Sequence, residues 1–278
     1  YLPGAGGAYV WLAKQFVKPA QKKPERPAKR VNLLGLTPLD FSVVGNATTL
    51  KQIVTDAGFT IQSSWSMGDT LDGLATAADA DVNAVVSSTA FYLAQYLRDT
   101  YGIPYVVGIP MGEKGTADWL EALKTGDSSY VTGLTGEEEY VKAQYALADL
   151  NAWKTEQAYD DTPCDVLVIG EPVYLQSMKA FLQDEMGVEK VRLLCPLSDA
   201  PQWLLKDMEV ASVEAVIRQE CRKARRVIAD PIYARLLPDE PGKFISMPHE
   251  AYSGRHYHED MPIFVGPTFT AWMKDKLK

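Results

Sequence analysis

Short apolar runs alternate with longer amphipathic stretches along this chain. Residues 31–36 form an apolar run that is too short for a helix and lies between Pro27 and Pro38, so it predicts a buried strand. A polar turn follows and ends at Gly45 and Asn46, after which apolar residues recur at helical spacing over 47–57. We expect Asn46 to cap the free N–H groups of that helix.

The same pattern returns at residues 164–188. An apolar run at 166–169 predicts a strand, Gly170 marks a turn, and Pro172 suits the first position of a helix. Two strand–turn–helix units this far apart predict two α/β domains. Strands are predicted at 31–36, 59–63, 82–86, 105–109, 166–169, 191–195, 226–229 and 244–247. Helices are predicted at 47–57, 70–77, 89–101, 117–123, 173–186, 212–224 and 231–236.

This alternation predicts the α/β class, with two Rossmann-like parallel-sheet domains covered by helices on both faces. A terminal helix and linker from an upstream domain occupy residues 1–30 in this interpretation. The first domain follows at 31–135, a long connecting helix at 136–160, and the second domain at 161–278.

Composition and charge narrow the class of protein. The chain has 278 residues, of which 46% are hydrophobic and 23% charged, as in a soluble globular protein. No apolar stretch is long enough to span a membrane, and the net charge of −8 argues against nucleic-acid binding. The basic residues of 18–30 are either a docking patch or, as we favour, a solvated linker. The three cysteines show no CxxC spacing, so we expect free thiols and a protein of the reducing cytoplasm.

Ligands of open parallel sheets bind beyond the carboxyl ends of the strands, which directs attention to four loops. The predicted strands place these loops at 37–46, 87–89, 111–116, and 170–172 with 196–201. Gly45 and Asn46 offer backbone donors for an anion at a helix start, although a simple capped helix explains them as well. Ser87 and Ser88 add hydroxyl groups, either for a ligand or as helix caps. No dinucleotide or P-loop motif is present in the sequence.

All three histidines of the chain lie in residues 248–260. His256 and His258 are two residues apart, so an extended segment would point both side chains the same way, as in a metal site. His249 is the third candidate ligand. The alternative to a metal site is a solvated polar loop, in which Tyr252, Ser253 and Gly254 form a turn.

These segments together resemble the nitrogenase component 1 family, which includes the molybdenum–iron protein subunits, cofactor-assembly relatives and dark-operative protochlorophyllide reductases. The resemblance runs from about Gly4 onward. Its strongest parts are VNLLG with VGNATTLKQIVTDAGF, YGIPYVVGIPMGEKGTADWL, VLVIGEPVYLQSMKAFLQDEMGV, RRVIADPIYARLL and AYSGRHYHEDMPIFVG.

The resemblance implies that the chain is domains two and three of a three-domain subunit. Family subunits pair with a related subunit and receive electrons from an ATP-dependent iron protein through iron–sulfur clusters. The cluster ligands would lie outside this chain. The resemblance also implies a cavity for a small-molecule substrate or metallocofactor, with Gly45, Asn46, Ser87, Ser88, His249, Tyr252, Ser253 and Gly254 as candidate cofactor-binding residues.

Two positions depart from the catalytic molybdenum–iron subunit. The position of its ligating cysteine falls near Val86 and Ser88, without a cysteine, and the spacing of its ligating histidine falls on Pro248, one residue before His249. We therefore expect a cytoplasmic nitrogenase-like oxidoreductase subunit, inactive as an isolated chain, rather than a dinitrogen reductase. The alternatives are a cofactor-assembly scaffold and a two-lobed small-molecule or metal-binding protein without redox activity.

Overall fold

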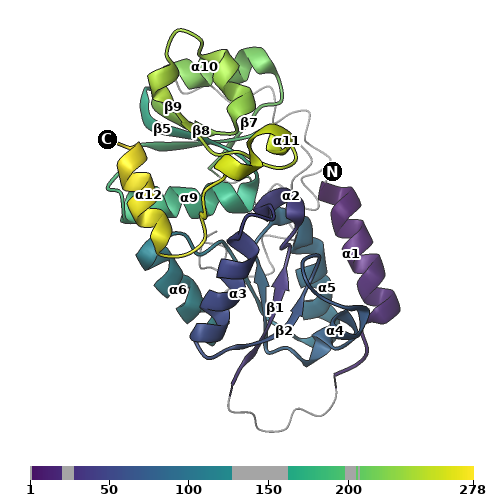
Figure 1. Cartoon of the computed structure of the whole chain (residues 1–278). Helices are drawn as coiled ribbons and strands as arrows, with labels where there is room; N and C mark the ends of the chain where they lie inside the picture. The colour runs from purple at the N-terminus through teal and green to yellow at the C-terminus, as the bar shows by residue number, and fades with distance from the viewer. Residues whose placement is uncertain (1, 21–27, 127–161, 198–204, 206) are drawn as a thin grey trace.

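The first domain is built on a four-stranded sheet in the computed structural model, which describes residues 2–20, 28–126, 162–197, 205 and 207–278. All strands of this sheet are parallel, in the order β2-β1-β3-β4. Helices α3 and α6 lie on one side of it, and α5 with α1 on the other (Figure 1). The elements are α1 (Leu2–Phe16), β1 (Arg30–Leu34), α2 (Pro38–Phe41), α3 (Asn46–Asp56), β2 (Thr60–Ser64), α4 (Leu71–Ala75), β3 (Val82–Val85), α5 (Phe91–Tyr101), β4 (Tyr105–Val107) and α6 (Gly112–Thr125).

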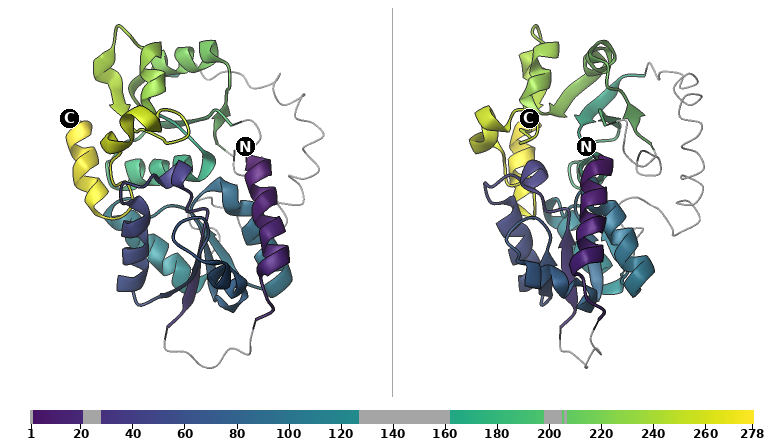
Figure 2. Two further views of the ribbon diagram at one scale, coloured as in Figure 1. Left: turned by 45° about the vertical axis from the view of Figure 1, so that its right-hand side comes forward. Right: turned by 90° about the vertical axis from the view of Figure 1, so that its right-hand side faces the viewer.

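The second domain repeats this architecture with five parallel strands in the order β7-β6-β5-β8-β9. In Figure 2 the two sheets lie one above the other, with α9 and α12 at the junction. The elements are β5 (Cys164–Ile169), α9 (Pro172–Asp184), β6 (Val191–Cys195), β7 (Glu209–Val210), α10 (Glu214–Lys223), β8 (Ala224–Ala229), β9 (Phe244–Ser246), α11 (Gly254–Tyr257) and α12 (Thr268–Lys276). The two-domain parallel α/β class predicted from the sequence is therefore confirmed.

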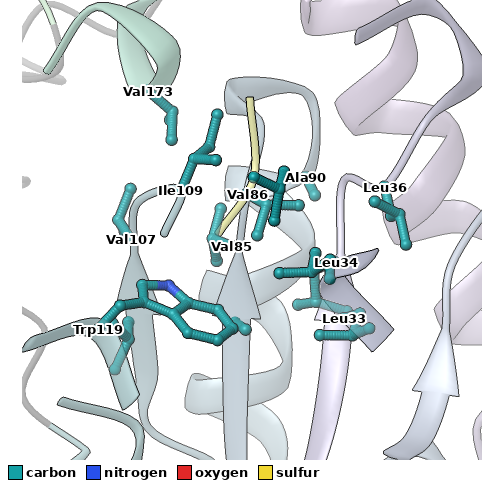
Figure 3. Close-up of a cluster of buried hydrophobic side chains, with 14 of the residues drawn as sticks. Leu33, Leu34, Leu36, Val85, Val86, Ala90, Val107, Ile109, Trp119 and Val173 are labelled. Carbon is teal, nitrogen blue, oxygen red and sulfur yellow. The ribbon is translucent and has the colours of Figure 1, made fainter. Parts of the chain in front are cut away.

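Apolar side chains of the first sheet continue into the domain junction. Strands covered on both faces favour apolar residues, as in β4 and most of β3, whereas the edge strand β2 has the sequence TIQSS. Trp119 of α6 is fully buried on this sheet and donates from Nε1 to the Gly108 carbonyl oxygen at 3.0 Å. Above it, Val173 of α9 lies near Ile109 (Figure 3), and the Ile109 N–H donates to Ser177 Oγ at 2.9 Å. One hydrophobic core thus spans both domains.

The C-terminal segment, which begins after Met261, packs against the first domain and so holds the two domains together. Gly266 forms a parallel bridge with Met111, in which its N–H donates to the Pro110 carbonyl at 2.7 Å. The carboxylate of Glu185, after α9, accepts hydrogen bonds from the first backbone N–H groups of α6 and from the Thr270 hydroxyl of α12. The free N–H groups of a helix start attract a carboxylate, so this contact stabilises the junction.

Local predictions fail where tertiary contacts decide the structure. The residue that caps α3 is Gly45, whose φ of +123° suits glycine, and Asn46 is the first helical residue. Asn46 does not cap the helix, because its buried side chain binds the C-terminal segment instead. The helix expected at 117–123 begins at Gly112, and α2 and β7 were not expected.

The connecting helix expected at 136–160 lies outside the described residues, so the domain boundaries remain a prediction. Within the part of the chain that the structure describes, no helix combines the length and apolarity that a membrane crossing requires.

Candidate functional site

A cavity lies between the two domains, where the carboxyl ends of both sheets face each other. Water-sized molecules can occupy about 40 Å³ of it, within a wider crevice of about 590 Å³ that includes open solvent. Both sheets reverse their strand order at this point, between β1 and β3 in the first and between β5 and β8 in the second. Loops diverge at such a reversal and leave a crevice, which is the usual ligand site of open α/β sheets. The lining residues are Asp40, Phe41, Val86, Ile109, Ile169, Gly170, Glu171, Tyr174, Pro196, Asp230, Tyr233, Met247, Pro248, His249, Tyr252 and Phe264.

Asp40 supplies a buried carboxylate from the first domain. Thr37 is the N-cap of α2, and Pro38 occupies the first turn of this helix. The helix start therefore places Asp40 beyond the carboxyl end of β1. Asp40 Oδ2 accepts hydrogen bonds from Thr37 Oγ1 at 3.0 Å and from Ser87 Oγ at 2.6 Å. Its Oδ1 lies 3.3 Å from Nε2 of His249, so this contact joins the two domains across the cavity.

His249 is held in this position by Asp230, at the carboxyl end of β8. Asp230 Oδ2 accepts from the His249 backbone N–H at 2.8 Å and from Ser253 Oγ at 2.7 Å, while Oδ1 accepts from the Ile232 N–H. The Ala251 N–H donates to His249 Nδ1 at 3.2 Å. The other ring nitrogen, Nε2, is therefore the one that faces Asp40 across the cavity.

Glu171 is a second carboxylate on the opposite wall, between β5 and α9. It caps α9 through the N–H groups of Val173 and Tyr174, and it accepts hydrogen bonds from Ser88 Oγ at 2.7 Å and Ser88 N–H at 3.2 Å. Burial, reinforced by the negative charge of Asp40, raises the pKa of Glu171 from 4.5 to about 7, although the hydrogen bonds from Ser88 and Tyr174 oppose this shift. Glu171 therefore changes charge near neutral pH.

Aromatic side chains form much of the remaining wall. The ring of Phe264 packs against Phe41 at 5.6 Å and against Tyr174 at 6.1 Å, measured between ring centroids. The Tyr174 hydroxyl is buried and has no hydrogen-bond partner among the described residues. Burial, followed by the nearby charge of Glu171, raises the pKa of Tyr174, so its hydroxyl stays protonated. A buried hydroxyl without a partner is unusual and marks a position where a ligand can bond.

The structure places the predicted residues at different distances from this cavity. His249 and Tyr252 line it, Ser87 and Ser88 bind its two carboxylates, and Ser253 binds Asp230. Gly254 is buried at the start of α11. Gly45 and Asn46 do not line the cavity, and the Asn46 side chain is occupied by the Pro262 carbonyl and the Phe264 and Val265 N–H groups.

The histidine segment is helical rather than extended. His256 is exposed in α11, and His258 begins a 3₁₀ turn at His258–Asp260, so the assumption of an extended segment was wrong. Across residues 2–20, 28–126, 162–197, 205 and 207–278, no group of three or more histidine, cysteine, aspartate or glutamate side chains is arranged to hold a metal ion. The metal site at His249, His256 and His258 remains a prediction without support from this arrangement.

Sequence reasoning missed the three carboxylates of the site. Glu171 and Asp230 each precede a proline that occupies the first turn of a helix, directly after a buried strand, and each caps that helix with its side chain. Asp40 follows a Thr-Pro pair at the start of α2. An acidic residue directly before a proline at the end of a predicted parallel strand would have found Glu171 and Asp230, whereas Asp40 lies two residues after its proline.

Comparison with known proteins agrees with this architecture. The family model described as "Nitrogenase component 1 type Oxidoreductase" matches residues 2–231. The chain belongs to this family.

The chain is similar to one of the subunits of light-independent protochlorophyllide reductases. It is 29% identical to that of Prosthecochloris aestuarii over 215 residues, which cover 74% of this chain and 40% of the relative. It is 23% identical to that of Zygnema circumcarinatum over 270 residues, covering 93% of this chain and 52% of the relative. The chain thus spans about half the length of these relatives or less.

Among solved structures, the chain resembles one described as "Nitrogenase Cp1 at pH 6.5". The TM-score is 0.61 at 14% sequence identity, and the match covers 99% of this chain and 64% of that one. At this identity the likeness concerns the fold alone. It supports the Rossmann-like interpretation of both domains.

Proposed function

We propose that this chain supplies two domains of a nitrogenase-like reductase subunit, and that the cavity between them holds the molecule to be reduced or a cofactor. The contact between Asp40 and His249 carries this proposal, because it joins both domains at the carboxyl ends of their sheets. The names of the protochlorophyllide reductase relatives support a reductase over a dinitrogen-reducing enzyme.

The chain's own residues have separable roles in this proposal. Phe41, Phe264 and Tyr174 exclude water and hold the apolar part of the bound molecule. Glu171 and the Asp40–His249 pair form the polar part of the wall, where a group that exchanges protons near pH 7 suits a reduction that consumes protons. Asp230 positions His249 through its backbone N–H.

Family members use iron–sulfur clusters, which supply single electrons at low potential. The residues of this chain do not fit such a cluster. Cys164, Cys195 and Cys221 are buried within the second domain, and none forms part of a metal-ligand group among the described residues. We therefore assign cluster binding to residues outside the 278 of this chain, and the role of this chain to the cavity.

A paired component 1-like subunit and an ATP-dependent iron protein complete the proposed complex. Exposed apolar side chains support such pairing, since Trp11 is 59% and Val43 75% exposed on the first domain. Large apolar side chains on a surface commonly mark contact sites for other proteins. Val43 follows α2, close in sequence to the cavity residue Asp40.

The test is anaerobic purification of the complete gene product together with its co-expressed partner subunits. We expect stoichiometric iron and acid-labile sulfide, and a cluster absorption that is bleached only when the iron protein and ATP are added. His249→Ala should abolish turnover while leaving the cluster absorption intact, whereas His258→Ala, a matched change at a 43% exposed histidine side chain, should leave turnover unchanged. Absence of clusters in the complete complex would favour the non-redox alternatives, an assembly scaffold or a two-lobed binding protein.

A further inference from the structure

One polar atom on the lining of the interdomain cavity differs from its neighbours. The hydroxyl oxygen of Tyr174 is buried, and it has no hydrogen-bond partner among the residues that the structure describes. The carboxylates of Glu171 and Asp230 on the same lining, by contrast, accept hydrogen bonds from hydroxyl and backbone N–H groups. A buried hydroxyl that is left unpaired costs folding free energy, so its presence on a cavity wall calls for an explanation.

The residues around Tyr174 fix the position of its ring. Tyr174 lies in the first turn of α9, where its backbone N–H donates to the Glu171 carboxylate at 2.6 Å. A Cβ atom at Gly170 would lie only 2.8 Å from the ring carbon Cδ1, so the missing side chain of this glycine makes room for the ring. The ring also packs edge-on against Phe264, with the centroids 6.1 Å apart. These contacts hold the hydroxyl at a defined place on the lining.

The Tyr174 hydroxyl keeps its proton and is therefore available as a hydrogen-bond donor. Burial raises its pKa, and the nearby charge of Glu171 raises it further, since a second negative charge is disfavoured there. A phenol has one O–H proton and an oxygen with lone pairs. Lone pairs are left unpaired in proteins more often than buried protons are, so the partner that this hydroxyl needs is an acceptor.

Resting on the proposed function of the cavity, we propose that Tyr174 recognises the ligand by donating a hydrogen bond to a carbonyl-type oxygen, in a ketone, ester or carboxylate group. The rings of Tyr174 and Phe264 contact the apolar part of the same molecule. A molecule of the same shape without this oxygen leaves the hydroxyl unpaired and binds more weakly. Tyr174 is in this assignment a residue that determines specificity, and its hydroxyl is kept for the ligand.

This role separates the stability of the protein from its binding of ligand. Tyr174→Phe removes the hydroxyl and keeps the ring. Because the hydroxyl has no partner in the described structure, the variant should have the Tm of the wild type or a higher one. A tyrosine that forms a structural hydrogen bond would lose stability on the same change. Recognition of the ligand oxygen, in contrast, should be lost.

Two probes of nearly the same shape measure the contribution of the oxygen: acetophenone, which has a carbonyl group, and isopropenylbenzene, in which a methylene group replaces that oxygen. Their dissociation constants are measured by calorimetry on the complete gene product with its partner subunits. The ratio of the two constants is compared between proteins, because the difference in hydration of the probes then cancels. We expect Tyr174→Phe to shift this ratio against acetophenone by about fivefold. Benzoate in place of acetophenone repeats the comparison for a carboxylate, and such a shift with either probe supports the assignment.

Tyr257→Phe is the matched control, since Tyr257 is 42% exposed in α11 and is not among the described lining residues. It should change neither the ratio nor the Tm. An unchanged ratio in Tyr174→Phe with both carbonyl probes, or a complex that binds none of the three probes, would overturn the assignment. A clear loss of Tm in Tyr174→Phe would also overturn it, because the hydroxyl would then have a structural partner. Each of these results leaves cluster content and turnover of the complete complex as a separate test of the proposed function.

Discussion

Glu171 makes the stability of this protein depend on pH in an uncommon direction. Most carboxylates of folded proteins have lowered pKa values, but burial and the charge of Asp40 raise that of Glu171 from 4.5 to about 7. Its residue is only 9% exposed, so solvent screening is weak. Replacing it by glutamine removes the titration and keeps the shape of the side chain.

The magnitude follows from the two pKa values. Below about pH 4.5 Glu171 is protonated in both states, and its contribution to stability is fully present. Between about pH 4.5 and 7 the unfolded chain has lost the proton that the folded chain retains, so the free energy of unfolding falls by about 1.4 kcal/mol per pH unit. Above pH 7 both states are ionised, and about 3 kcal/mol has been lost relative to pH 4.

Urea unfolding of the wild type and Glu171→Gln, followed by tryptophan fluorescence at half-unit steps of pH, isolates this term. Other titrating groups are common to both proteins and cancel in the difference. We expect the wild type to lose about 3 kcal/mol relative to the variant between about pH 4.5 and 8. A difference that stays constant across this window would refute a raised pKa at Glu171, whatever the loss of the helix cap costs at any single pH.

Three further substitutions test how the structure is held together. Asn46→Ala should lower the free energy of unfolding by about 2–4 kcal/mol in urea titrations, because it leaves buried backbone groups of the C-terminal segment without hydrogen-bond partners. A loss below about 1 kcal/mol would contradict those hydrogen bonds. Trp119→Ala should cost about 3–5 kcal/mol in the same assay because its whole ring is buried, and a near-neutral result would mean that α6 does not pack there. Glu185→Ala should lower stability by about 1–2 kcal/mol in thermal unfolding, whereas Asp184→Asn, in an exposed ion pair with Lys114, should change it by less than about 0.5 kcal/mol.

The fold was largely predictable because its information is local. Parallel strands such as β1 and β5 are covered on both faces, so they appear in the sequence as apolar runs bounded by turns. Elements of one turn or two residues, such as α2 and β7, lack a period long enough to detect. Asn46 shows the limit of local rules, because its amide satisfies a segment that lies more than two hundred residues further along the chain.

The site was predictable only in outline. Strand ends identified the loops that contribute Asp40, Ser87 and Glu171, since the carboxyl edge of a parallel sheet is where loops converge. The pairing of Asp40 with His249 depends on how two domains face each other, and no local pattern encodes that orientation. The raised pKa of Glu171 has the same origin, because it requires burial by both domains together.

The bridge between Met111 and Gly266 limits the design of chimeric proteins that exchange domains between members of this family. The residues after Met261 form the end of the second domain in sequence, yet they contact Asn46 and Met111 of the first. A chimera cut between the two sheets would therefore import a foreign surface into the first domain. To keep the contacts with the first domain, the exchanged piece must end before Pro262, and the tail must come from the same parent as α3 and α6. The contacts between the tail and the second domain, such as the hydrogen bond from Thr270 to Glu185, then form the new junction.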